Sequence, residues 1–313
     1  MSSIISFLSG AVRIGTVFLF GSTGETLTEK SGHLNLGIPG IMCFGALGGC
    51  IGVSIVGSVT FLTVVFAIIC SFIFAGFLGA IYCVLTVSLR ANQNVTGLTI
   101  TTFGVGLTNF FGPRVNDSAF FTASRDHFTH LFGFYKSLGF FGELFLSYGV
   151  LVYVSIIIAI LVSLFLGKTK HGLHLRAVGE SPATADAAGV NVTFYRYIST
   201  VVGSGIAGLG GLFYIMDFLG GSWEYTIDAM GWLSIALVIF TVWRPSLGIL
   251  GSILFGALYI LAYYIAVPTT YINLLKMIPY LVTIIVLILT SIFGSKNVQP
   301  PASLGLNYFR EDR

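Results

Sequence analysis

Long apolar segments alternate with short polar connections along almost the whole chain of 313 residues. A helix needs about 20 residues to cross the hydrocarbon core of a bilayer. By that measure the pattern predicts nine transmembrane helices, with eight to ten as the range. The predicted spans are 3–21, 37–56, 62–88, 95–112, 146–166, 197–216, 229–243, 247–267 and 277–293. The expected fold class is therefore all-α, a polytopic membrane helix bundle in which residues 1–313 form a single transmembrane domain.

The composition supports a membrane protein. Apolar residues make up 55% of the chain and charged residues 9%, whereas soluble domains carry about 25% charged residues. A net charge of +3 gives no indication of a nucleic-acid partner. The four cysteines lie in apolar segments without a C-x-x-C pair, so we expect reduced packing residues, no metal site and no cofactor.

The distribution of lysine and arginine predicts the orientation, because cytoplasmic loops are enriched in both. Loop 167–196 is the most basic connection. With this loop inside, ten basic residues fall on the cytoplasmic side and four outside. Residues 294–313 then form a cytoplasmic C-terminal tail, and the N-terminus lies outside. Residues 113–145 form the one sizeable outer loop, for which we expect an interfacial hairpin or an amphipathic helix.

Loop 167–196 contains the signals of one short helix. The Ser181 hydroxyl can accept from a free backbone N–H of a first turn, and Pro182 fits the first helical position. Gly189 can adopt the left-handed conformation that ends a helix. A helix of about seven residues is too short to be stable alone, so it packs on its own bundle as a connector or offers a docking surface. The candidate docking residues are Glu180, Ser181, Pro182, Ala183, Thr184, Ala185, Asp186, Ala187, Ala188 and Gly189.

Two other polar groups are candidates for a solute pathway. Residues 21–40 are rich in glycine and polar side chains between two spans. They form a plain cytoplasmic loop or a re-entrant turn whose Asn35 faces a lumen. Segment 94–111 carries a second group, Asn94, Thr99, Phe103 and Asn109. Uncharged polar and aromatic side chains suit a neutral, hydrogen-bonding solute that can stack, although threonine and asparagine also join helices without any solute.

The sequence lacks the motifs of several enzyme classes. It contains no G-x-x-x-x-G-K-[ST], no H-E-x-x-H and no G-x-S-x-G. The spans also show no run of acidic or basic residues for a proton relay. We therefore expect a transport subunit that is not an enzyme and whose energy comes from a separate ATPase. A passive channel is the alternative from a different class.

Two segments resemble signatures of a known family. GETLTEKSGHLNLGIPGIMCFGA (24–46) and GLHLRAVGESPATADAAGVNV (172–192) are similar to segments of the membrane permeases of ABC importers for ribose-type sugars, branched-chain amino acids and nucleosides. The nucleoside-type branch, in its smaller permease, is the most similar. SGIAGLGGLFYI (204–215) and WRPSLGILGSILFGAL (243–258) extend the resemblance. One departure is Pro39-Gly40, where the family often has an acidic residue before the glycine.

The resemblance implies a type II-like ABC importer permease in a bacterial plasma membrane. It implies a heterodimer with a second, paralogous permease, with the pathway between the two chains and membrane lipid around them. An ABC ATPase subunit would grip the coupling helix at about Ser181–Ala188, and an extracellular substrate-binding lipoprotein would deliver nucleosides. The same machine with a ribose-like sugar or a branched-chain amino acid as cargo is the alternative.

Overall fold

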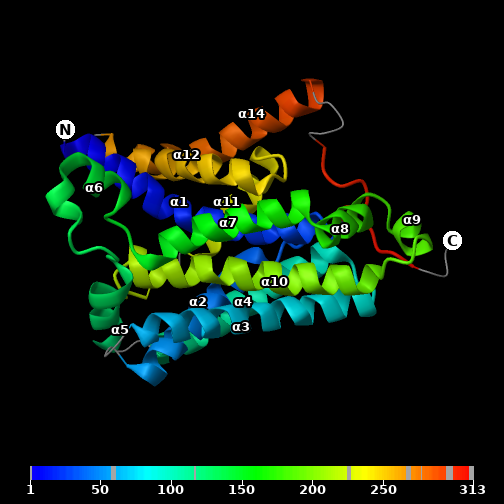
Figure 1. Ribbon diagram of the computed structural model, residues 1–313, viewed down its shortest axis with the longest axis horizontal. Helices are drawn as coiled ribbons and strands as arrows, with labels where there is room; N and C mark the ends of the chain where they lie inside the picture. The colour runs from blue at the N-terminus through cyan, green and yellow to red at the C-terminus, as the bar shows by residue number, and fades with distance from the viewer. Residues whose placement is uncertain are drawn as a thin grey trace.

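The computed structural model describes residues 2–57, 61–115, 118–223, 227–265, 269–275, 277–293 and 299–309. Within these ranges the regular secondary structure is helical (Figure 1). The first half contains α1 (Ser2–Glu29), α2 (Ile38–Val56), α3 (Leu62–Cys83), η1 (Val84–Ser88), α4 (Gln93–Val115), α5 (Ser118–Ala123), η2 (Ser124–Phe128), η3 (Tyr135–Leu138) and α6 (Gly139–Phe145). The second half contains α7 (Val150–Lys168), α8 (Lys170–Glu180), α9 (Pro182–Ala187), α10 (Val192–Phe213), η4 (Tyr214–Phe218), α11 (Ile227–Phe240), α12 (Pro245–Tyr264), α13 (Thr269–Leu275) and α14 (Ile278–Phe293).

Each predicted span falls on one of the long helices. Five helical segments are long and apolar enough to cross a membrane: Ile4–Glu29, Ile38–Val56, Leu62–Ser88, Val150–Lys168 and Val192–Phe218. Three shorter apolar helices cover Met230–Phe240, Pro245–Leu261 and Ile278–Leu289. The helix α4 holds the remaining predicted span and is not among these eight. The all-helical membrane fold is thus confirmed, while the number of nine crossings stays a prediction.

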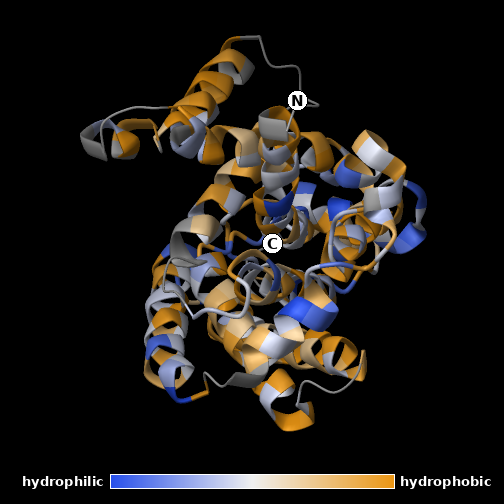
Figure 2. Cartoon of the chain, turned by 90° about the vertical axis from the view of Figure 1, so that its left-hand side faces the viewer, coloured by the Kyte–Doolittle hydropathy of each residue, from blue (hydrophilic) through white to orange (hydrophobic). Residues whose placement is uncertain are grey.

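The centre of the bundle is α10, which packs against α1, α2 and α3. Glycine makes this packing close. A Cβ atom on Gly45 of α2 would collide with the backbone of Gly208 of α10, and one on Gly24 of α1 would collide with the carbonyl of Gly203. Small residues let membrane helices approach until their backbones touch. These four helices therefore form a tightly packed block. Figure 2 shows hydrophobic residues on most helices of the chain.

The two ends of the bundle differ. The short elements α5 and α6 lie at the end where α1 begins, whereas α8, α9 and residues 299–309 lie toward the opposite end (Figure 1). The predicted outer and inner loops are thus at opposite ends, and residues 118–145 form several short helices. Lys30, Arg176 and Arg244, which come from three separate connections, line one cavity at the α8 end. This clustering agrees with the predicted cytoplasmic side.

Candidate functional site

The short helix predicted in the basic loop is present as α9. The Ser181 Oγ accepts a hydrogen bond from the Thr184 backbone N–H at 3.4 Å, and Pro182 occupies the first helical position. Gly189 has a φ of 83°, in the left-handed region. The N–H groups of Gly189 and Val190 donate to the carbonyls of Asp186 and Ala185, both at 2.9 Å. Both ends of the helix are therefore capped as the sequence predicts.

The helix α9 is fixed on one side and open on the other. Ala185 is only 4% exposed and packs in the main apolar core. Ala183, Thr184, Ala187, Ala188 and Gly189 are exposed, and so is Glu180 just before the helix. Ser181, Pro182 and Asp186 are half-buried. Most of the predicted docking residues are thus accessible to a partner, whereas Ala185 serves internal packing. Docking itself stays a prediction.

A second helix, α8, leads into α9, and sequence reasoning missed it. Thr169 caps it, since its Oγ1 accepts from the Gly172 N–H at 3.0 Å. At its far end, a Cβ on Gly179 would collide with the Lys30 carbonyl. The sequence signal for α8 is a capping threonine followed by a weakly hydrophobic run. Such a run resembles an ordinary polar loop, so the helix was missed. The helix α8 therefore holds α9 at a fixed place at the end of the bundle.

The C-terminal strap, residues 299–309, connects α9 to the rest of the inner end. The Tyr308 hydroxyl donates to Asp186 Oδ2 at 2.7 Å, and the Ser303 N–H donates to the Gly179 carbonyl at 3.0 Å. The Asn307 amide donates to the Arg90 carbonyl at 2.9 Å. In Figure 1 the strap runs past α8 to α9. The sequence predicted only a tail here, over 294–313, of which 294–298 and 310–313 lie outside the described residues.

The strap also reaches the start of α4. The Gln93 amide donates to Asn307 Oδ1 at 3.2 Å, and the Gln93 Oε1 accepts from the Leu34 N–H at 2.8 Å. A continuous set of polar contacts therefore runs from Asp186 on α9 through Tyr308 and Asn307 to Gln93 on α4. Such a chain of contacts is a physical route by which movement of α9 can reach α4.

The polar segment 21–40 differs from its prediction. The helix α1 continues through Glu29, so only residues 30–37, the inner turn, are not regular helix. Asn35 is fully buried: its N–H donates to Glu25 Oε1 at 3.0 Å, and its Oδ1 accepts from the Gly37 N–H at 2.9 Å. Among the described residues, Asn35 Nδ2 and Glu25 Oε2 have no hydrogen-bond partner. Asn35 thus shapes the inner turn, and its solute-pathway role stays a prediction.

His33 joins the inner turn to two other helices. Its Nδ1 lies 2.9 Å from Thr200 Oγ1 of α10, and its Nε2 lies 2.8 Å from Thr86 Oγ1 of η1. Burial lowers the pKa of His33 to about 3, and the positive charge of Arg196 contributes to the decrease. The imidazole is therefore neutral at physiological pH, so one nitrogen donates and the other accepts.

The four pathway residues predicted on segment 94–111 lie on the exposed face of α4. Asn94, Thr99, Phe103 and Asn109 are all exposed, whereas the opposite face packs on α2. The Thr99 hydroxyl donates to the carbonyl of its own helix at Val95, at 2.8 Å. Thr99 and Phe103 line a shallow groove of about 450 Å³ with Thr102, Gly106 and Leu107. The exposed face is therefore more apolar than the stripe that the sequence predicted.

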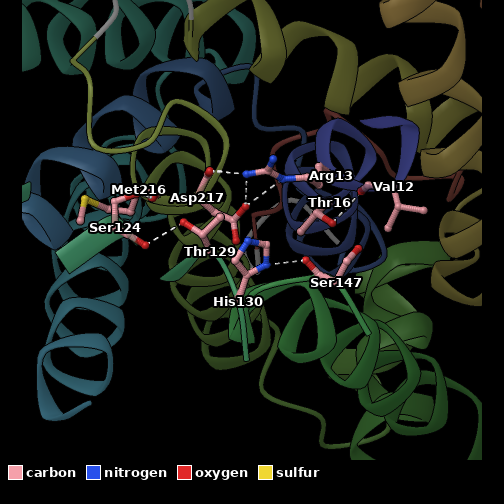
Figure 3. A network of polar contacts seen from close by, with 9 residues as sticks. All are labelled: Val12, Arg13, Thr16, Ser124, Thr129, His130, Ser147, Met216 and Asp217. Carbon is pink, nitrogen blue, oxygen red and sulfur yellow. Dashed lines mark hydrogen bonds and ion pairs between the residues drawn. The ribbon is translucent and has the colours of Figure 1, made fainter. Parts of the chain in front are cut away.

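An ion pair at the outer end was not anticipated. Arg13 of α1 and Asp217 of η4 lie 2.8 Å apart, between Nη2 and Oδ1 (Figure 3). The Asp217 side chain is 1% exposed and the Arg13 side chain 31% exposed. Neighbouring contacts in Figure 3 join η2 to η4, because the Ser124 hydroxyl donates to the Met216 carbonyl at 2.6 Å. No local pattern in the sequence relates these two residues.

Four buried charges lie in the membrane-length helices just beyond the ends of the predicted spans. Glu25, Glu29, Arg196 and Asp217 are all at most 3% exposed. They lie near the two ends of the bundle: Asp217 at the outer end, and Glu25, Glu29 and Arg196 near the inner turn or α9. Charge inside a membrane protein usually marks a functional or assembly site.

These features together define a polytopic membrane protein, whose inner end carries a capped helix with an open face. The sequence profile of the family described as the branched-chain amino acid transport system / permease component matches residues 7–287. The chain belongs to this family of ABC transporter permeases. It is therefore an integral membrane protein, and it does not itself catalyse a reaction. The family implies an ATPase partner and a substrate-binding protein.

Three similar relatives carry names that state a transported solute. NupC, a nucleoside ABC transporter permease of Lactococcus lactis, is 30% identical over 94% of this chain and 94% of its own length. NupQ, a guanosine ABC transporter permease of Bacillus subtilis, is 29% identical over 93% of this chain and 92% of its own length. TsgC13 of Haloferax volcanii, named for glucose transport, is 33% identical over 82% of this chain and 77% of its own length. No solved structure gives a significant match.

Proposed function

We propose that this chain is the membrane subunit of an ATP-driven importer of nucleosides. The observation that carries the proposal is the similarity to the nucleoside and guanosine permeases, which extends over at least 92% of each chain. The resemblance includes the inner turn and the α8–α9 region. Hydrogen bonds to the strap join these two parts, from Gly305 to Gly32 and from Ser303 to Gly179. A sugar is the second candidate cargo, because the relative named for glucose transport is 33% identical to this chain.

The ATPase contacts the open face of α9 in this proposal. Ala183, Ala187 and Ala188 are small and exposed, so a groove on a partner can receive them without steric conflict. Asp186 connects this helix to Tyr308 of the strap, and the strap connects to Gln93. ATP binding and hydrolysis on the partner displace α9, and the strap transmits the displacement to α4.

The exposed face of α4 borders the solute pathway and faces a second, paralogous permease. Leu98, Phe103 and Phe110 are large, apolar and at least 47% exposed on this face. Asn94 and Asn109 add hydrogen-bonding groups near its two ends. A partly apolar face with a few amides suits a nucleoside, whose base stacks and whose ribose forms hydrogen bonds. The extracellular lipoprotein delivers the solute at the α5–α6 end.

Uptake measurements test the function directly. Labelled uridine and adenosine are supplied to cells with and without this gene, with unlabelled nucleosides, nucleobases, ribose, glucose and leucine as competitors. We expect uptake to be lost on deletion and competition by nucleosides alone. Nucleoside uptake that is unchanged on deletion, in a strain with no second nucleoside importer, would reassign the cargo to a sugar. Uptake that survives ATP depletion would instead identify a passive facilitator.

A further inference from the structure

A cavity of about 600 Å³ lies at the inner end of the bundle, apart from α9 and the α4 face. It is bounded by the end of α1, the C-terminal end of α7, the helix α8 and the turn between α11 and α12. Its lining consists of Lys30, Ser163, Leu166, Gly167, Leu173, Arg176, Ala177, Glu180, Val242, Trp243, Arg244, Pro245, Ser246 and Gln299. Most of these side chains lie outside the features discussed for transport; the exceptions are Lys30 of the inner turn, Glu180 and Gln299 of the strap.

The cavity is strongly positive. Lys30, Arg176 and Arg244 contribute three positive charges, and Glu180 contributes one negative charge. The ion pairs found among the described residues are Arg13–Asp217 and Arg125–Asp126, so none of the three cations is paired there. Burial is the main cause of the lowered pKa of Lys30. The negative charge of Glu180 opposes this decrease, whereas the positive charges of Arg176 and Arg244 add to it. The three cations thus repel one another, and an anion between them relieves the repulsion.

One wall of the cavity is held in an unusual backbone conformation. Val242 and Trp243 have φ values of 54° and 53°, a region that β-branched and bulky residues rarely adopt. The Trp243 indole N–H donates to Glu29 Oε2, which fixes this turn against α1. Arg244 follows directly and is exposed. Strained residues of this kind cluster at ligand-binding sites, and here they set the position of one of the three cations.

The surroundings of the cavity are apolar on the side toward the membrane. Leu161 and Leu164 of α7 are exposed within two turns of the lining residue Leu166, and Leu247 and Leu250 of α12 are exposed close to the lining residue Ser246. These leucines lie on membrane-length or shorter apolar helices. A ligand at this place therefore meets cations at its head and hydrocarbon-facing side chains beside it.

We propose that this cavity binds the phosphate headgroup of an anionic phospholipid from the inner leaflet, with its acyl chains along α7 and α12. Basic pockets between helices on the cytoplasmic side recognise such headgroups. A free phosphate shares the headgroup chemistry but gains nothing from the exposed leucines. The bound lipid joins α8, and through it α9, to α1 and the α11–α12 turn.

Native mass spectrometry of the purified, delipidated full-length chain tests this assignment. Phosphatidylglycerol and phosphatidylcholine with identical acyl chains are titrated separately, and the bound lipids are counted. We expect preferential binding of one phosphatidylglycerol. Each cation near the membrane surface contributes about fivefold to the affinity for an anionic lipid. The Arg176→Gln/Arg244→Gln double variant should therefore weaken this binding by roughly 25-fold.

The matched control is the Lys168→Gln/Lys170→Gln variant. It removes the same charge from the same end of the bundle, and its residues are exposed and outside the cavity lining. Its phosphatidylglycerol affinity should stay within about twofold of the wild type. The Arg176→Lys/Arg244→Lys variant keeps the charge and should retain the lipid, which separates charge loss from misfolding.

Three results would overturn the proposal. An equal loss of binding in the control variant would show a diffuse surface attraction rather than a site. Equal binding of phosphatidylcholine would show that the cations are not used. Competition by glycerol 3-phosphate or inorganic phosphate at concentrations equal to that of the lipid would identify a free anion as the ligand. None of these measurements depends on which solute the chain transports.

Discussion

Replacing Tyr308 by phenylalanine removes the hydroxyl that donates to Asp186 Oδ2 at 2.7 Å and keeps the aromatic ring. A hydrogen bond to a charged group contributes about 1.5–3 kcal/mol. Both residues are half-buried, so solvent competes and the lower value of about 1.5 kcal/mol applies. That loss shifts the equilibrium between the bound and released strap by roughly tenfold.

Hydrogen exchange measures the release of the strap. The backbone N–H groups of Ser303 and Gly305 donate to the carbonyls of Gly179 and Gly32, so they should exchange up to about tenfold faster in Tyr308→Phe. Transport is measured in proteoliposomes with the ATPase partner, as solute imported per ATP hydrolysed. If the strap transmits the movement of α9 to α4, this ratio should fall while ATP hydrolysis continues.

The matched control is Tyr271→Phe, which removes the same hydroxyl from an exposed tyrosine of α13. It should leave both strap exchange and the transport ratio unchanged. A strap that exchanges faster in Tyr308→Phe, combined with a normal transport ratio, would refute the proposed route through the strap. Unchanged exchange would refute the estimated strength of the Tyr308–Asp186 bond.

Four further outcomes are expected. Ala188→Glu places a charge on the open face of α9 and should abolish uptake at normal membrane levels; normal uptake would argue against docking there. Asn35→Ala should change the KM or the maximal rate of nucleoside uptake without loss of assembly, and wild-type kinetics would remove Asn35 from the pathway. Arg13→Ala leaves a buried carboxylate unpaired and should lower the stability in detergent by about 3 kcal/mol, with recovery when Asp217→Asn is added. Because the pKa of His33 is lowered to about 3 by burial, the contribution of His33 to stability should be constant above pH 6.5 and decrease below it by up to about 1.4 kcal/mol per pH unit; the difference between the melting curves of the wild type and His33→Gln should therefore change only below pH 6.5.

Local signals predicted much of this fold. The apolar segments predicted the positions of the long helices. The limits of α9 were predicted from Ser181, Pro182 and Gly189, because helix capping depends on residues that are close in sequence. The end of α1 was placed too early, since five glycines and two glutamates in segment 21–40 resemble a loop. Helix packing overrides that tendency: Gly24 lies against Gly203 of α10.

The contacts within the candidate site could not be predicted in the same way. The Arg13–Asp217 pair joins residues 204 positions apart, and the Tyr308–Asp186 bond joins residues 122 positions apart. No periodicity or capping rule relates such distant positions, because only the tertiary fold brings them together. The four candidate residues of segment 94–111 lie on the exposed face of α4, and their role stays a prediction. The Thr99 hydroxyl donates to a carbonyl of its own helix, which composition does not reveal.

The pattern of packing also constrains how the transporter can move. The helices α1, α2, α3 and α10 touch through glycine backbones, and α4 joins this block where a Cβ on Gly104 would collide with the Gly40 backbone. Close-packed interfaces of this kind rearrange in discrete steps rather than by gradual deformation. The polar contacts of α9, the strap and the inner turn join α9 to the same block. Displacement of α9 should therefore move the block and α4 together as one body. This body would move against the molecule that covers the exposed face of α4. The contacts that change during transport should therefore lie at that face and not inside this chain.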